Sequence, residues 1–501
     1  MIWTESAHWN FEDNLRLFSQ GSGKALLGKG NHGLEREALR VLGDGTLSLR
    51  PHPRAIGDKL THPAITTDFS ESQLEFITPP FATLEECYRF LAQIHGFVSQ
   101  NINGELLWPM SMPCRLPAEA DIPIAHYGEG AAGMAKEIYR RGLALRYGKV
   151  IQMVCGIHYN FSFSQDFWEF LHGKLPVSHM DLQDFINEGY CAMVRNFLRL
   201  RWLFVYLYGA SPVVDSSYTT KALEALQLVG TDTYGLPYAT SLRMSHFGYS
   251  NEEQRNFRVC YNTLERYISD LRRAMSMPDS RYEALGLYRD GQQVQLNANV
   301  LQIENEYYAP IRLKNSPEPG ETQLESLERS GVRYIEVRAS DLNPYNPFGL
   351  ECDRLYFLHM LLIYCLLRHS DHCSRREREE EINSNERLVA LEGRKPGIEI
   401  AFCGQKRDMR QAARLFLGDM EKIALLLDEH GEEPKYTRCV LRARERIENS
   451  ELTLSGMMMA ELTQGGTSFV EHGLSLGRLH KMAYDRMEKV TGLWELLARG
   501  E

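Results

Sequence analysis

Polar and apolar residues alternate along five stretches of the chain. They read GLEREALRV (33–41), ITTDFSESQLEFIT (65–78), VIQMVCGIHYNFSFS (150–164), NVLQIENEYYAPIR (299–312) and VRYIEVRASD (332–341). An alternation with a period of two is typical of a strand that is buried on one face. The pattern therefore predicts five strands.

Longer stretches between these strands repeat their apolar residues at the spacing of an α-helix. They cover residues 84–101, 184–207, 251–277 and 348–368, and a shorter amphipathic pattern covers residues 10–27. Because helical insertions separate the strands, the sheet must be assembled from distant parts of the sequence, with helices packed on one side. We predict a fold of the α+β class.

Strand patterns become sparse beyond about residue 375. The charged run RREREEEINSNER is typical of a solvated helix face, and helical patterns follow over residues 420–430 and 436–447. We therefore predict two parts. Residues 1–375 form the sheet with its helical insertions, and residues 376–501 form a mainly helical part packed on the same body.

The composition narrows the class of protein. The 501 residues are 43% hydrophobic and 24% charged, and the net charge of −10 argues against nucleic acid or an anionic membrane as the main partner. The apolar run at 356–367 is too short to cross a bilayer, and the first residues lack the pattern of a secretory signal. The ten cysteines include no CxxC pair, which favours reduced thiols in the cytoplasm.

A glycine-rich segment, GSGKALLGKGNHG (21–33), invites comparison with a phosphate-binding loop. Neither of its Gly-Lys pairs is followed by the Ser or Thr that the P-loop pattern requires. We therefore predict a flexible connector there.

Acidic residues stand at matching positions within the predicted strands. Glu35 and Glu37 are two residues apart and share one face, as do Glu71, Gln73 and Glu75 in the next stretch. Asp68 can share that face only if it precedes the strand or if a bulge intervenes.

The later strands add one imidazole and further charged groups. His158, Asn160 and Ser162 share one face of their stretch. In the last strand, one face carries Tyr334, Glu336, Arg338 and Ser340.

Clustered carboxylates with one imidazole need cations to neutralise them, and such oxygen-rich ligands suit Mg²⁺, with Mn²⁺ as a substitute. A divalent cation can bridge phosphate oxygens, which favours an ATP-dependent enzyme. Spacing alone leaves a two-metal hydrolase or amidase equally open, and a non-catalytic ligand-binding sheet protein is a third reading.

A series of long phrases carries a resemblance to a known family. In chain order these are GLEREALRV, THPAITTDFSESQLEFITP, LWPMSMPC, YGKVIQMVCGIHYNFS, LYGASP, LPYATSLRMS, NVLQIENEYYAPIR, YIEVRASDLNP and LEGRKPG. From about Gly33 to Gly397 the chain closely resembles the glutamate–cysteine ligases (γ-glutamylcysteine synthetases) of the proteobacterial type. The resemblance implies a curved, largely antiparallel sheet similar to that of glutamine synthetase and other carboxylate–amine ligases, with helices packed outside it.

The resemblance also implies a site, residue by residue. The family's metal ligands fall on Glu35, Glu37, Asp68, Glu75, His158 and Glu336. Its anion-binding, catalytic arginines fall on Arg243 and Arg338, and its cysteine-substrate pocket falls on Tyr139, Gln152, Tyr249 and Tyr308.

The implied activity is the joining of L-glutamate to L-cysteine. ATP phosphorylates the γ-carboxylate, with Mg²⁺ as the metal, and the amine of cysteine attacks the γ-glutamyl phosphate. The product, γ-glutamylcysteine, is the first intermediate of glutathione biosynthesis. We expect a cytoplasmic enzyme, a monomer, with no nucleic-acid or membrane partner.

Overall fold

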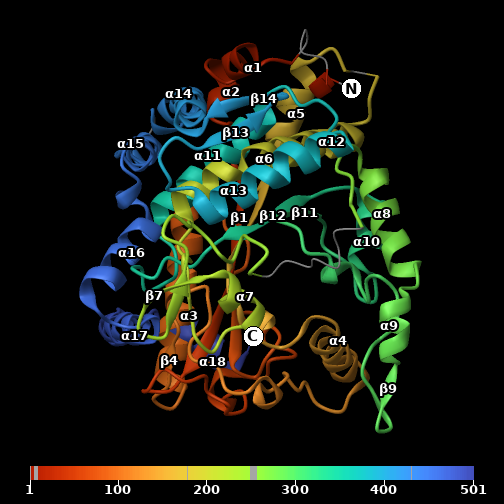
Figure 1. Cartoon of the computed structure of the whole chain (residues 1–501). Helices are drawn as coiled ribbons and strands as arrows, with labels where there is room; N and C mark the ends of the chain where they lie inside the picture. Colours follow the sequence, from red (N-terminus) through yellow and green to blue (C-terminus); the bar gives the residue numbers. More distant parts are fainter. Residues whose placement is uncertain (1, 5–8, 178, 249–256, 430, 501) are drawn as a thin grey trace.

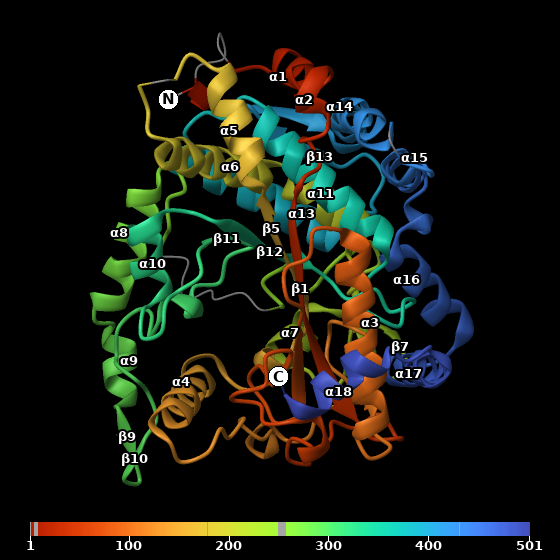
Figure 2. The same ribbon diagram turned by 180° about the vertical axis from the view of Figure 1, so that it is seen from behind.

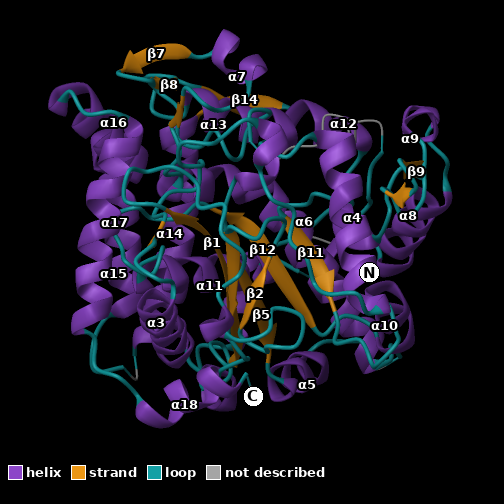
Figure 3. Ribbon diagram, turned by 90° about the horizontal axis from the view of Figure 1, so that it is seen from below, coloured by secondary structure: helices purple, strands orange, loops and turns teal. Residues whose placement is uncertain are grey.

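A sheet of antiparallel strands runs through the middle of the molecule (Figures 1 and 3). The computed structural model describes residues 2–4, 9–177, 179–248, 257–429 and 431–500. Within them the strand order is β11-β12-β5-β1-β3-β2, and β4 pairs with the end of β1. The bounds of these strands are β1 Gly30–Val41, β2 Ile65–Thr67, β3 Gln73–Ile77, β4 Leu106–Leu107, β5 Ile157–Phe163, β11 Ile311–Lys314 and β12 Tyr334–Ser340.

The register of the sheet gathers the acidic residues on one face. Cα pairs join Glu37 to Glu75 and Glu35 to His158, and Asn160 on β5 pairs with Glu336 on β12. Residues that lie opposite each other on neighbouring strands point to the same face. These residues from four strands therefore share one side of the sheet.

Helices α3 (Leu84–Asn101), α6 (Leu182–Tyr208) and α11 (Cys352–Leu367) cover the other side of the sheet (Figure 2). Thr83 caps α3 by accepting a hydrogen bond from the backbone N–H of Glu86, as expected for an N-cap threonine. Every residue of α11 after Cys352 is buried, which agrees with its largely apolar sequence. The predictions for these three helices are close to the observed bounds.

The remaining elements surround this core. The other helices are α1 Phe11–Leu17, α2 Gly21–Lys24, α4 Ala131–Tyr147, α5 Gln165–Lys174, α7 Thr220–Ala225, α8 Leu264–Ser276, α9 Ser280–Leu285, α10 Gln323–Ser330, α12 Arg375–Glu377, α13 Asn383–Glu392, α14 Met409–Asp428, α15 Lys435–Glu448, α16 Leu454–Gly465, α17 Phe469–Arg486 and α18 Thr491–Arg499. Small antiparallel sheets are formed by β6 Val213–Asp215, β7 Gln227–Gly230 and β8 Thr233–Gly235, by β9 Tyr288–Arg289 and β10 Gln292–Gln293, and by β13 Glu399–Phe402 and β14 Gln405–Asp408. None of the described helices is long and apolar enough to cross a membrane.

Three strand predictions were too long. Residues 65–78 form β2 and β3 with a tight turn between them, and the N–H of Asp68 donates to the carbonyl of Gln73 across that turn. Of residues 299–312, only the last two belong to a strand, and residues 304–306 form a 3₁₀ turn. The prediction for residues 150–164 was wrong up to Gly156, where a 3₁₀ turn precedes β5.

Three other expectations also changed. The predicted helix over residues 251–277 begins only at Leu264, and its first six predicted residues lie outside the described part of the chain. The glycine-rich segment is not one connector, because residues 21–24 form α2 and residues 30–33 begin β1. Residues 10–27 hold two short helices in place of one.

The C-terminal helices pack on the same core as the sheet. Helices α14 and α15 contact α11, and α17 and α18 contact α3. Gly473 on α17 lies directly against the buried indole of Trp108. We propose that residues 376–501 and the preceding part of the chain form one folding unit.

A single methyl group tests this packing. In Gly473→Ala the new Cβ meets the Trp108 ring, so we expect the free energy of unfolding to fall by about 1–3 kcal/mol. The matched control is Gly418→Ala on α14, where a Cβ meets no atom within 4 Å, and we expect no loss of stability there. Urea denaturation followed by circular dichroism measures both. Equal midpoints for Gly473→Ala and the wild type would contradict the proposed packing.

Candidate functional site

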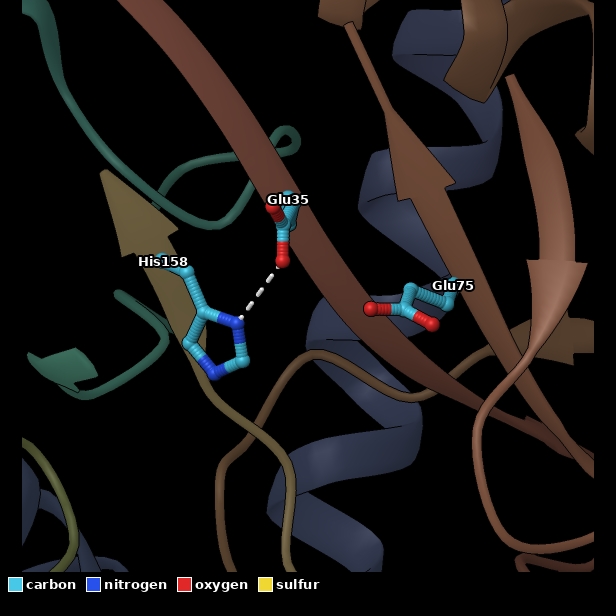
Figure 4. Close-up of side chains that lie close together, drawn as sticks. All are labelled: Glu35, Glu75 and His158. Carbon is cyan, nitrogen blue, oxygen red and sulfur yellow. Dashed lines mark hydrogen bonds and ion pairs between the residues drawn. The ribbon is translucent and has the colours of Figure 1, made fainter. Parts of the chain in front are cut away.

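Three strands of the central sheet bring an imidazole and two carboxylates together. Glu35 on β1, Glu75 on β3 and His158 on β5 each offer one ligand atom, and these atoms lie within 4.8 Å of one another. Figure 4 shows the side chains of Glu35 and Glu75 reaching from neighbouring strands into the same space as the imidazole. This spacing fits a metal ion bound between strands.

A cavity of about 450 Å³ lies between this face of the sheet and α4. All the predicted site residues except Tyr249 line it: Glu35, Glu37, Asp68, Glu75, Tyr139, Gln152, His158, Arg243, Tyr308, Glu336 and Arg338. Tyr249 lies outside the described residues. The structure thus brings the predicted residues together, and their individual roles remain predictions.

Hydrogen bonds orient the carboxylates on β1. Glu35 accepts a hydrogen bond from Nδ2 of Asn160 at 2.8 Å, and its second oxygen lies 3.1 Å from Nδ1 of His158. Glu37 accepts a hydrogen bond from the backbone N–H of Gly156 at 2.7 Å. The two acids are therefore held by β5 and by Gly156 just before it, and their oxygens keep further lone pairs for a ligand.

The end of the cluster at Glu336 is rich in positive charge. Arg338 forms a 2.5 Å ion pair with Glu336, and Lys314 and Arg312 lie 3.7 Å and 3.8 Å from its second oxygen. Burial alone would raise the pKa of Glu336, but these three cations hold that pKa well below its usual range. Glu336 is therefore a carboxylate even without a bound metal.

The opposite end of the cluster lacks this compensation. Burial, followed by the charge of Glu37, raises the pKa of Asp68 to about 6. Burial and the charges of Asp68, Glu35 and Glu37 raise the pKa of Glu75 well above its usual range. A divalent cation would remove this repulsion, so the residues present fit a metal site.

The turn between β2 and β3 explains the position of Asp68. The pairing of Thr66 with Glu75 puts both on one face, and Asp68, two residues after Thr66, follows the same face. Arg140 on α4 donates to the backbone carbonyl of Asp68, and its guanidinium lies 4.7 Å from the centre of the Tyr127 ring. A turn, not a bulge, thus resolves the parity problem in the sequence.

Two residues that strand parity grouped with the acids lie elsewhere. Glu71 is in the turn, where it pairs with Lys59 and accepts from the backbone N–H of His126. Ser340 follows a register shift between Val337 and Ser340, and it accepts a hydrogen bond from Arg354 at 3.1 Å. The prediction from regular alternation was wrong at both places because the backbone departs from regular strand geometry there.

Four cationic residues that line the cavity were not predicted from the sequence. Arg312 and Lys314 alternate on β11, at and just beyond the end of a predicted strand, so parity could have placed them opposite Glu336 and Tyr334. Lys136 and Arg140 come from α4, a helix that was not predicted. The cavity is therefore less acidic than the sequence suggested.

Comparisons with known proteins agree on one family. The family model for glutamate–cysteine ligase matches residues 15–389. A glutamate–cysteine ligase of Clostridium acetobutylicum is 42% identical over 480 residues, which cover 93% of this chain and 99% of that protein. One from Shewanella amazonensis is 43% identical over 465 residues, covering 92% of this chain and 87% of that protein.

Solved structures give the same result. The crystal structure of a Francisella tularensis glutamate–cysteine ligase in complex with AMP is similar, with a TM-score of 0.87, 30% identity and coverage of 94% of this chain and 92% of that one. A bifunctional glutathione synthetase from Pasteurella multocida has a TM-score of 0.76 and 28% identity, and covers 98% of this chain and 58% of that one. These similarities confirm the predicted α+β class.

The metal site can be tested without measuring turnover. We expect MgCl₂ to raise the melting temperature of the wild-type protein, because a cation offsets the repulsion around Glu75. In Glu75→Gln the repulsion is already reduced, so the shift produced by MgCl₂ should be much smaller. Scanning calorimetry with and without MgCl₂ measures the difference.

Glu71→Gln is the control for this prediction, because Glu71 pairs with Lys59 outside the cavity. It should lower stability but keep the response to MgCl₂. A full MgCl₂ shift in Glu75→Gln would argue against a metal site at this residue.

Proposed function

Because the chain belongs to the glutamate–cysteine ligase family, we propose that it joins the γ-carboxylate of L-glutamate to the amine of L-cysteine at the expense of ATP. The product is γ-glutamylcysteine, a precursor of glutathione. The observation that carries the proposal is one cavity lined both by an acidic cluster and by six cationic side chains, those of Lys136, Arg140, Arg243, Arg312, Lys314 and Arg338.

A free carboxylate is a poor acylating agent, so it must first be activated. Transfer of the γ-phosphoryl group of ATP to the γ-carboxylate gives γ-glutamyl phosphate and ADP. The amine of cysteine then attacks the acyl carbon, a C–N bond forms, and phosphate leaves as the amine loses a proton. Positioning and electrostatics suffice for this sequence, and no enzyme nucleophile is needed.

The acidic cluster is proposed to hold the metal. The residues are Glu35, Glu37, Asp68, Glu75, His158 and Glu336, whose hard oxygen atoms and single imidazole suit Mg²⁺, with Mn²⁺ as a substitute. When bound, such a cation neutralises phosphate charge and orients the phosphoryl group. Asn160 supports this arrangement by holding Glu35 in place.

The cationic residues are proposed to bind anionic groups of the substrates. Arg338 is half-buried and ion-paired with Glu336, and the surrounding acids raise its pKa further, so it remains charged. Its guanidinium suits the equatorial oxygens of a transferring phosphoryl group. Arg312 and Lys314 extend the positive charge along β11, where a polyphosphate chain can lie.

Tyr139, Gln152 and Tyr308 line the cavity and are proposed, with Tyr249, to form the pocket for cysteine. Discrimination for one side-chain group in such a pocket is worth roughly 1–3 kcal/mol. Amino acids similar to cysteine should therefore react slowly.

A cytoplasmic location and a monomeric state remain part of the proposal.

A metal-dependent hydrolase or amidase is the alternative that the acidic cluster alone leaves open. The similar Francisella tularensis ligase was crystallised with AMP, which supports a nucleotide in the reaction. In a hydrolase the nucleophile is water, and ADP is not formed. Product analysis therefore separates the two functions.

The ligase proposal predicts that ADP release with MgCl₂ requires both L-glutamate and L-cysteine. Glu336→Gln should lower the rate at least about 10²–10³-fold, because it removes a metal ligand and the counter-charge of Arg338. A coupled assay of ADP, with mass analysis of the dipeptide, measures this.

The control for Glu336→Gln is Glu351→Gln, a half-buried acid that pairs with Arg354 away from the cavity. It should retain most of the activity. Wild-type turnover in Glu336→Gln, or amide hydrolysis without ADP, would contradict the ligase mechanism.

A further inference from the structure

Arg243 reaches the cavity from a bend outside the central sheet. The bend follows Ser241, which bridges to Ser211, and the side chain of Arg243 is only 5% exposed. Its Nη2 donates to the backbone carbonyl of Arg338 at 2.9 Å. The guanidinium of Arg243 therefore lies beside β12, next to the backbone of Arg338, whose side chain pairs with Glu336.

The counter-charge of Arg243 is Asp341, a residue that is 1% exposed. Oδ1 of Asp341 lies 3.6 Å from Nη1 of Arg243, and it has no hydrogen-bond partner among the described residues. Oδ2 accepts hydrogen bonds from the N–H of Ala210 at 2.8 Å and from the hydroxyl of Ser211 at 2.7 Å. Asp341 is thus fixed by the 210–211 turn and presents its other oxygen to Arg243.

A β-bulge explains how Asp341 comes to face Arg243. Between β12 and β5 the register shifts, so that Val337 pairs with Tyr159 but Ser340 pairs with Ile157. The extra residue in β12 puts Ser340 on the side of Ile157, away from His158. Asp341, the next residue, therefore lies on the face of the sheet that lines the cavity. In a strand without the bulge it would lie on the other face.

Gly156 leaves the space that the guanidinium occupies. A Cβ at Gly156 would collide with Nη2 and Cζ of Arg243. The backbone of Gly156 also donates to Glu37, so the guanidinium lies against the segment that orients a predicted metal ligand. Its φ is not in the left-handed region, so the side chain of alanine is excluded by Arg243 and not by backbone strain.

We propose that Asp341 and Gly156 are positioning residues that fix the guanidinium of Arg243 where it binds an anionic group of a substrate. Asp341 supplies the charge that orients the guanidinium, and Gly156 supplies the space. The inference rests on the proposed ligase function, and it adds two residues that do not themselves line the cavity.

Asp341→Asn is the principal test. The amide keeps an oxygen for Ala210 and Ser211 but turns an N–H₂ group toward the guanidinium, so two donors face each other. We expect kcat/KM to fall about a hundredfold, mainly through a higher KM for the substrate whose anionic group Arg243 binds. Steady-state kinetics for ATP, L-glutamate and L-cysteine identifies that substrate.

Gly156→Ala should raise the KM of the same substrate, because the methyl group displaces the same guanidinium. Arg243→Lys should do so as well, and adding Asp341→Asn to it should lower kcat/KM little further. The control is Asp215→Asn, a buried acid that bonds to Ser217 and has the same isosteric change away from the cavity. It should leave every KM unchanged.

Three results would overturn the inference. In the first, Asp341→Asn lowers stability but leaves each KM at the wild-type value, which indicates a structural role only. In the second, the effects of Asp341→Asn and Arg243→Lys on kcat/KM multiply. In the third, Gly156→Ala and Asp341→Asn raise the KM of different substrates. Wild-type enzyme that forms no dipeptide would instead reject the ligase function itself, so the two failures are distinguishable.

Discussion

Repulsion between buried carboxylates is the constraint that the rest of this structure must satisfy. Acids from β1, β3, β12 and the β2–β3 turn converge on one cavity, where each is buried or half-buried. At Glu336 the repulsion is offset by Arg338, Arg312 and Lys314. At Glu75 and Asp68 the repulsion is not offset to the same degree, so these carboxyl groups must bind either protons or a cation. This asymmetry divides the cavity into one end where the protein's own cations balance the acids and another where the acids are proposed to bind a metal.

The sheet suits this task because its register is set by hydrogen bonds between backbone groups and does not depend on the acidic side chains. Antiparallel pairing aligns Glu37 with Glu75 and Glu35 with His158, while α3, α6 and α11 bury the other face. Burial of that apolar face supplies the free energy that keeps like charges close together. The arrangement separates the residues that stabilise the fold from those that line the cavity.

Strand parity predicted the site wherever the backbone stays regular. Glu35, Glu37, His158 and Glu336 were grouped correctly because β1, β5 and the first half of β12 are continuous strands. The same argument failed for Glu71 and Ser340. A turn and a β-bulge change the face to which these side chains point, although polar and apolar residues still alternate in the sequence. The resemblance to the ligase family added Tyr139, Gln152, Tyr308 and Arg243, which come from helices and bends where no periodicity points to the cavity. Arg140 and Asp341 depend on contacts between distant segments, and such contacts leave no local signal in a single sequence.

The order of strands in the central sheet has a consequence for biosynthesis. β1 lies near the N-terminus, yet its neighbour β5 and then β12 are translated much later, and the sheet is complete only when β12 has left the ribosome. Pairings between segments so distant in sequence form slowly, because a long loop must close before they are stabilised. Until then part of the sheet lacks a neighbouring strand, although β1 can already pair with β3, and Glu35 cannot meet Glu336 before residue 336 has been translated. The cavity therefore cannot bind its ligands during most of translation.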